Sequence, residues 1–310
     1  MKRREFLKTT AAVGIAALTV EDLAAAMRSG GVTTVESSPD LVAVMGGEPK
    51  QLLDRALQEL GGIGRYVKRG QSVLIKPNIG WDKSPEMAAD TNPELVGALV
   101  EQCFSAGAKR VSVFDHTCDN WQKCYVSSGI RAAAEAAGAV VVPGNDESYY
   151  REVAIDGAVE LKSVKIHRLL FESDVWFNVP VLKNHGGAKM SIAMKNYMGI
   201  VWDRGFFHSH DLQQCIADIC LFDRKPVLNI IDAYRCMTRN GPQGRSVSDA
   251  VTLKALIAST DIVAADTAAV GLFNQVKEMD IREVGHIANG ERMRIGTKDL
   301  GKLNIKRVKL

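Results

Sequence analysis

The chain has 310 residues, of which 46% are hydrophobic and 24% are charged, and its formal net charge at pH 7 is +3. This composition is that of an ordinary globular protein, and the length suffices for one large hydrophobic core or two small ones. The small charge surplus, spread over 39 basic and 36 acidic residues, argues against nucleic acid as a partner.

The N-terminal residues 1–26 have the layout of an export signal. Arg3 and Arg4 precede the letters EFLK, an order typical of the twin-arginine leader, and an alanine-rich apolar run, residues 11–20, follows them. This run is about half as long as a bilayer-spanning helix, so we expect no stable membrane span. We expect the twin-arginine translocation machinery as a partner and a periplasmic or extracytoplasmic location; the alternative is an ordinary amphipathic helix.

Residues 27–40 are small and polar, and we expect them to link the signal to a single α/β domain over residues 41–310. Strand-like and helix-like segments alternate along that domain. Strands are expected at residues 41–46, 72–77, 110–115, 139–143, 174–183, 225–232 and 253–260. Helices are expected at residues 49–61, 92–107, 126–137, 210–222, 261–274 and, in short form, 191–196.

This alternation predicts a mostly parallel sheet with helices on both faces. Residues 144–170 are more polar and less regular, and we expect them to form a small irregular insertion with antiparallel strands at 153–156 and 161–167. Residues 285–310 are expected to form a helix remnant and short strands. Because ligands of such sheets bind beyond the carboxyl ends of the strands, we expect the functional site there.

Basic side chains follow two of the expected strands. Residues 179–197 contain Lys183 and Lys195 but no Asp or Glu, and Lys76 stands at the end of the strand 72–77. If the strands are parallel, the three lysines meet at one edge and suit a phosphate, a carboxylate or a developing oxyanion. The ordinary alternative is that each lysine is a strand-end or surface residue.

Two asparagines accompany these lysines, Asn78 two residues after Lys76 and Asn196 directly after Lys195. Amide side chains donate and accept hydrogen bonds, so we expect both to help bind the same small anionic ligand. The sequence therefore predicts a substrate-binding set consisting of Lys76, Asn78, Lys183, Lys195 and Asn196.

Histidines supply the candidate proton carriers. His185 follows the lysine of the strand 174–183, and His208 and His210 belong to the run HSHD. An imidazole moves protons near neutral pH, so His185 or His208, oriented by Asp115, are the expected catalytic residues. Because neutral imidazoles also bind metals, His208, His210 and Asp232 are the alternative metal ligands; the remaining alternative is a surface pair that caps a helix.

Cysteines are dispersed through the chain. Cys118 and Cys124 lie in one expected loop together with Asp115, and can close it by a disulfide; the alternative is a loop that contacts the ligand. The chain has no C-x-x-C pair, so an iron–sulfur cluster is not expected. The glycine patterns of a P-loop, a dinucleotide-binding fold and an α/β-hydrolase are also absent.

Three segments resemble the family catalogued as domain of unknown function 362. They are VLIKPNI at residues 73–79, VPVLKNHGGAKMSIAMKNYMGIV at residues 179–201 and NIIDAY at residues 229–234. The resemblance covers roughly residues 41–306 and implies no established activity. Some members of that family carry a ferredoxin-like segment with clustered cysteines, and this chain departs from them there.

These observations together favour an exported enzyme that acts on a small anionic substrate, with a metal ion or a redox step as options. The alternative is a periplasmic ligand-binding or cofactor-delivery module without catalysis. A third interpretation, an iron–sulfur electron-transfer protein, has no cysteine spacing to support it.

Overall fold

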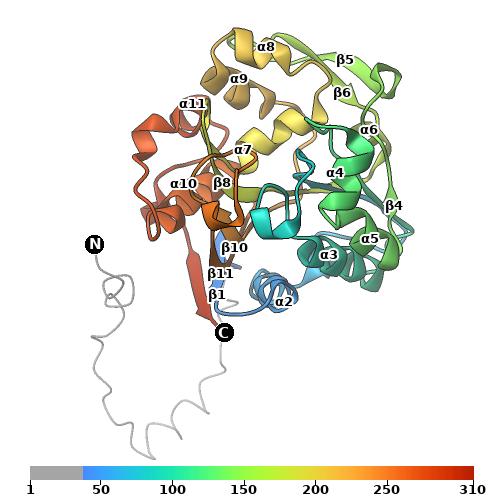
Figure 1. Cartoon of the computed structure of the whole chain (residues 1–310). Coiled ribbons are helices and arrows are strands. Elements are labelled where there is room, and N and C mark those ends of the chain that lie inside the picture. Colours follow the sequence, from blue (N-terminus) through green and yellow to red (C-terminus); the bar gives the residue numbers. More distant parts are fainter. Residues whose placement is uncertain (1–37) are drawn as a thin grey trace, which may run out of the picture. The chain divides into compact units, whose positions relative to one another are not determined.

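A ten-stranded sheet forms the centre of the part of the chain that the computed structural model describes, residues 38–310 (Figure 1). The predicted export signal, residues 1–26, and most of the predicted linker lie outside the described residues. The strands are β1 (Leu41–Met45), β2 (Ser72–Pro77), β3 (Arg110–Val113), β4 (Val140–Val141), β7 (Val175–Val179), β8 (Val181–His185), β9 (Lys189–Ser191), β10 (Leu228–Met237), β11 (Ala250–Ser259) and β12 (Ile305–Lys309).

The main path of the sheet runs in the order β12-β1-β11-β10-β7-β2-β3-β4; β8 pairs with β10, and β9 pairs with β8. Neighbours on this path are parallel except β11, which is antiparallel to both β1 and β10. The prediction of a mostly parallel sheet is thus confirmed. Strand β11 is reversed because only a short connection, without a crossover helix, links it to β10.

Helices cover both faces of the sheet. The α-helices are α2 (Pro49–Glu59), α3 (Pro93–Ser105), α4 (Trp121–Ser127), α5 (Ile130–Ala136), α6 (Leu169–Glu172), α7 (Ala193–Asn196), α8 (Gly205–Ser209), α9 (Leu212–Ile219), α10 (Ile262–Phe273) and α11 (Gly285–Arg292). Short 3-10 helices are η1 (Ile63–Arg65), η2 (Pro85–Met87), η3 (Glu147–Tyr149), η4 (Tyr197–Ile200), η5 (Val247–Asp249), η6 (Ile281–Glu283) and η7 (Leu300–Lys302). Figure 1 shows α2, α3 and α5 on one side of the strands and α10 and α11 on the other.

Side chains of a strand alternate between these two helix layers. In β2, Val73 and Ile75 pack with α2, α3 and α5, whereas Leu74 joins the core that contains α9 and α10. Lys76 continues the alternation on the face of Leu74. Lys76 is therefore directed toward α7 and η4 and away from the α2–α3 layer.

Two predicted elements are divided in the structure. The helix predicted at 126–137 is wrong as one element: Gly129, with φ of 72°, separates α4 from α5, because a left-handed residue interrupts a right-handed helix. The strand predicted at 174–183 ends at Val179, since Pro180 has no N–H to donate, and β8 continues beside β10.

The predicted insertion is confirmed as a separate two-stranded antiparallel sheet. It consists of β5 (Tyr150–Ala154) and β6 (Ser163–His167), with Tyr150 opposite His167. Helices α8 and α9 lie on the same side of the molecule as this hairpin (Figure 1). None of the helices within residues 38–310 combines the length and the apolar composition that crossing a bilayer requires.

Candidate functional site

A row of polar residues crosses four neighbouring strands on the face of the sheet toward α7. Lys76 of β2 is level with Asn178 of β7, which is level with Asn229 of β10 and, in turn, Ser259 of β11. The amide nitrogen of Asn178 donates to Asn229 Oδ1 at 2.9 Å, and that of Asn229 donates to the carbonyl oxygen of Ser259 at 3.2 Å. This polar row fixes the floor of the candidate site.

Lys76 and Asp115 form a buried ion pair at one end of the polar row. Their side chains are 1% and 2% exposed, and Lys76 Nζ lies 2.8 Å from Asp115 Oδ1. Lys76 also donates to Asn196 Oδ1 at 2.8 Å, and Ile79 N donates to Asp115 Oδ2 at 2.7 Å. Burial lowers the pKa of Lys76, and the Asp115 carboxylate opposes that shift. The structure brings Lys76, Asp115 and Asn196 together, as the sequence predicted.

Gly199 of η4 covers this ion pair. A Cβ atom at Gly199 would lie 1.9 Å from Asp115 Oδ1 and 2.4 Å from Lys76 Nζ, so no side chain fits there. The glycine lets the backbone approach and keeps water from the pair.

Lys183 lies next to Lys76 and is likewise 1% exposed. Its ammonium donates to Asn78 Oδ1 at 3.1 Å and to the carbonyl oxygen of Ala89. Asn78 in turn donates to Asn196 Oδ1 at 3.3 Å, which joins the two lysines through their asparagines. Burial lowers the pKa of Lys183 and raises that of its neighbour Asp90, while the attraction between the two charges opposes both shifts.

Lys195 and Arg204 are the cations of this cluster without a carboxylate partner in the described part of the chain. The one hydrogen bond of Lys195 Nζ within residues 38–310 is to Met198 Sδ at 3.4 Å. Arg204 donates to the carbonyl oxygens of His116 and Thr117, at 2.8 Å and 2.6 Å, and to the thiol of Cys118 at 3.3 Å. Burial lowers the pKa of Lys195 to about 8; Cys118 opposes this shift, and the neighbouring cations Lys183, Arg204 and Lys76 add to it.

The carboxylate of Asp266 holds the helix turn α7, which carries Lys195. Asp266 of α10, which is completely buried, accepts hydrogen bonds from Ala193 N at 2.7 Å and Met194 N at 3.0 Å. These are the first N–H groups of α7, which have no partner inside the helix. Asp266 therefore positions both Lys195 and Asn196.

The histidines of the site are neutral. Ala188 N donates to His185 Nδ1 at 3.1 Å, so the proton of this imidazole is on Nε2. Burial and the neighbouring cations Lys195 and Lys183 lower the pKa of His185 to about 2. His208 is exposed, and burial followed by the charge of Lys195 lowers its pKa as well. His185 is thus a hydrogen-bond donor at neutral pH and a poor base.

The predicted metal ligands do not meet. His208 and His210 are exposed, and His210 stacks on Phe206 at 3.7 Å between ring centroids. Asp232 is 3% exposed and accepts from Asn92 N at 2.7 Å and Tyr234 N at 3.0 Å, which uses both oxygens. Residues 38–310 contain no group of three His, Cys, Asp or Glu side chains that could hold a metal ion. The hypothesis that these three residues form one metal site is wrong.

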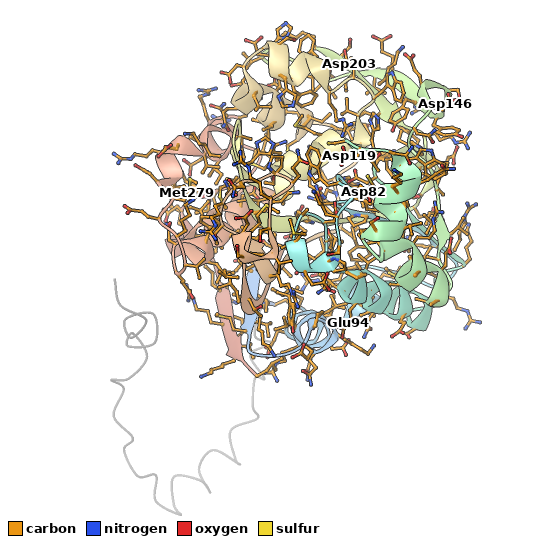
Figure 2. The ribbon with its side chains drawn as sticks, viewed as in Figure 1. Asp82, Glu94, Asp119, Asp146, Asp203 and Met279 are labelled. Carbon is orange, nitrogen blue, oxygen red and sulfur yellow. The ribbon has the colours of Figure 1, made fainter. Side chains whose placement is uncertain are left out.

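The predicted disulfide is also wrong. Cys118 and Cys124 are free thiols, the first exposed and the second buried in the middle of α4. The loop that contains Cys118 is closed by hydrogen bonds instead, since Cys118 N and Asp119 N both donate to the carbonyl oxygen of Gly80. Figure 2 shows Asp82 and Asp119 as neighbours close to α4, and Asp82 N donates to Asp119 Oδ2 at 3.2 Å.

A hollow of about 620 Å³ opens beside Arg204, against the β5–β6 hairpin. Trp202 lies in its wall and stacks on His116 with 5.1 Å between the ring centroids. Asp203, labelled near α8 in Figure 2, lines the same hollow. Arg204 therefore faces both the lysine cluster and this hollow.

Asn178, Asp266 and Asp90 were not among the residues that the sequence predicted for the site, and neither were Arg204 and Gly199. Asn178 is a polar residue inside the apolar run DVWFNVPVL, and that interruption was the available signal. Asp266 lies in the predicted helix 261–274, whose other buried positions are mostly apolar, and gave a similar signal. Asp90 precedes a helix cap in a loop, where an aspartate is unremarkable.

Comparisons with known proteins give a family and distant relatives. A family model described as Domain of unknown function (DUF362) matches residues 73–271. The Thylakoid-associated protein sll1697 of Synechocystis sp. is 24% identical over 244 residues, which cover 76% of this chain and 72% of that protein.

Two solved structures align more distantly. A protein from Thermotoga maritima aligns with a TM-score of 0.44 and 12% identity, over 76% of this chain and 62% of its own. The lactate racemase apoprotein from Thermoanaerobacterium thermosaccharolyticum aligns with a TM-score of 0.35 and 11% identity, over 69% and 53% respectively. This chain spans less than two thirds of the length of either.

Proposed function

Because the chain belongs to the DUF362 family, whose description assigns no activity, we propose its function from the chemistry of the site. The proposal is an enzyme that binds a small carboxylate or phosphate compound beside Lys195 and Arg204 and moves a proton on it. The substrate would contact the partly exposed members of the cluster, and the buried members would hold these in place.

The observation that carries the proposal is an excess of positive charge. Within the described residues the cluster combines four cations, Lys76, Lys183, Lys195 and Arg204, with two carboxylates, those of Asp115 and Asp90. Desolvated cations without a counter-charge are costly, and an anionic ligand would relieve that cost. Arginine and lysine are also the side chains that recognise carboxylate and phosphate groups.

Lys195 is the better candidate for proton transfer than His185. Its pKa of about 8 lies near physiological pH, where a group can both take up and release a proton. His185, with a pKa of about 2, is suited instead to donate its Nε2 hydrogen to a developing oxyanion. Asn78 and Asn196 would hold the neighbouring lysines, and His208 would line the opening.

Binding without catalysis is the second candidate, as a ligand-binding or cofactor-delivery module. It is favoured by the hydrogen bonds of Lys76 and Lys183, which are already directed to protein acceptors. In that case Lys76 and Lys183 would have a structural role. Among the four cations, only Lys195 and Arg204 would contact the ligand.

The test is a thermal-shift titration with inorganic phosphate and with malonate at pH 7 and pH 9. A bound anion stabilises the native state, by roughly 2–4 °C per kcal/mol. We expect the shift to be smaller at pH 9, where the Lys195 ammonium loses its proton, and to disappear in Lys195→Met. Lys189→Met is the matched control, because Lys189 pairs with Glu283 at 2.7 Å on the surface. Equal shifts in all three proteins would refute the anion site.

Turnover separates the two candidates. Deuterium exchange from D2O into carboxylic acids with a C–H bond next to a carbonyl group, followed by NMR, reports proton transfer directly. Exchange that is lost in Lys195→Met supports the enzyme, and tight anion binding without exchange supports the binding module.

A further inference from the structure

The ammonium of Lys195 differs from those of its two lysine neighbours in what surrounds it. Lys76 and Lys183 direct their N–H groups to oxygen acceptors and are each 1% exposed, so no substrate atom reaches their nitrogens. Lys195 is half-buried, and within the described residues its one hydrogen-bond acceptor is the weakly accepting sulfur of Met198. Its nitrogen therefore keeps hydrogen-bonding capacity that no oxygen atom of the described residues uses.

We propose that Lys195 is a nucleophile whose amine forms an imine with the carbonyl carbon of a small 2-oxo acid. The proposal rests on the proposed function, since the same site must bind the carboxylate of the substrate. It adds the substrate class and the covalent step. A 2-oxo acid carries both groups that the site addresses, a carboxylate for the uncompensated cations and a carbonyl carbon for the amine.

The electrostatic surroundings keep part of this amine unprotonated. Lys183, Arg204 and Lys76 each disfavour a further positive charge at Lys195, and burial acts in the same direction. Desolvation and a neighbouring cation are the two means by which enzymes activate an amine for attack on a carbonyl group. The turn is also rigid, because Asp266 holds its first two N–H groups.

The covalent step is balanced with groups that are present. The lone pair of the neutral amine forms the C–N bond while the π electrons of C=O move to oxygen. Two protons leave nitrogen for that oxygen, the C–O bond breaks, and water departs as C=N forms. Once protonated, the imine nitrogen withdraws electrons and makes the neighbouring C–H bond more acidic. The Nε2 hydrogen of His185 can donate to the oxygen during the addition.

The experiment is reductive trapping with pyruvate and sodium borohydride on the chain as expressed. We expect intact-mass analysis to show one reduced pyruvate adduct, and peptide mapping to place it on Lys195. Trapping should accelerate from pH 6 to pH 8 as the neutral amine becomes more abundant. Acetone, which lacks the carboxylate, should give much less adduct at the same concentration.

Two variants complete the design. Lys195→Arg keeps the charge but has no nucleophilic amine, so it should give no adduct while malonate still raises its melting temperature. Lys189→Arg, six residues away on the surface, should trap pyruvate like the parent chain. If no adduct forms, or if adducts are spread over surface lysines, the proposal that Lys195 forms an imine is wrong.

The two proposals fail in different ways. If malonate stabilises the protein and pyruvate is not trapped, the imine is wrong and the anion site stands. If neither malonate nor phosphate stabilises the protein, the anion site fails, and with it the substrate class inferred from it.

Discussion

Burial determines what each polar side chain of the site can do. Lys76 and Asp115 are withdrawn from water and neutralise one another, so their contribution is to hold Asn196 and the η4 backbone in place. Lys195 retains some contact with solvent and lacks a counter-charge within residues 38–310. The sequence predicted that these residues converge, because strand ends of a parallel sheet share an edge. It did not predict which of these side chains have all their hydrogen-bond and charge partners within the protein, because that depends on Asp90, Asn178 and the Gly199 backbone that covers the ion pair.

Replacing Asp115 by Asn should destabilise the fold strongly. The variant leaves the Lys76 ammonium buried without its carboxylate, and such a loss costs about 3–5 kcal/mol. Urea denaturation of the two proteins measures the difference. Asp119→Asn, in the exposed part of the same loop, should cost less than about 1 kcal/mol. Similar losses in both variants would show that the ion pair contributes little.

Asp232 makes stability depend on pH. Burial raises its pKa from 3.8 to about 6, so its stabilising contribution is complete below pH 3.8 and is lost as the pH rises through 6. Asp232→Asn does not titrate and keeps one acceptor for the backbone N–H groups. Relative to this variant, the parent chain should lose roughly 2 kcal/mol between pH 4 and pH 7. Urea denaturation at both pH values tests this, and a constant difference between the proteins would contradict it.

Most elements follow from local sequence signals. Asn92 and Asp261 begin α3 and α10 as predicted, each accepting from backbone N–H groups of the first turn. The errors arose where a single residue changes the chain direction, as Gly129 does between α4 and α5 and Pro180 does between β7 and β8. The strand β9 was missed because three residues carry too little pattern to identify.

Gly199→Ala tests whether η4 must approach the ion pair closely. The added methyl group would overlap Asp115 Oδ1 and Lys76 Nζ, so we expect a loss of roughly 1–3 kcal/mol and a lower melting temperature. Gly271→Ala is the matched control, because no atom lies within 4 Å of its Cβ position in α10. That substitution should stabilise the protein by about 0.5–1 kcal/mol. If both variants melt at the same temperature, the close approach does not matter.

At the scale of the whole molecule, composition and alternation were sufficient to predict the fold class but not the strand order. The antiparallel pairing of β11 with β1 and the pairing of β8 with β10 depend on contacts between segments far apart in sequence. The export signal belongs to residues outside the described part, and it stays a prediction. Its test is therefore cellular.

Replacing Arg3 and Arg4 by Lys should retain the protein inside the cell. The twin-arginine pair is read by a receptor, so a change that preserves charge removes recognition without altering the folded domain. Immunoblotting of cytoplasmic and periplasmic fractions measures the distribution. Lys2→Arg and Lys8→Arg, made together, preserve the pair and should leave export intact. Equal distribution of all proteins would contradict a twin-arginine signal.

The polar row from Lys76 to Ser259 also specifies the register in which the strands of the sheet pair. Side chains alternate along each strand, so sliding one strand by a single residue would turn its polar member toward the apolar layer of α2 and α3. The strands β7, β10 and β11 must align for Asn178 to donate to Asn229 and for Asn229 to donate to the carbonyl oxygen of Ser259. A sheet with one strand in the wrong register would bury ammonium and amide groups among apolar side chains without hydrogen-bond partners. The polar residues beneath the site therefore disfavour incorrect strand pairing during folding.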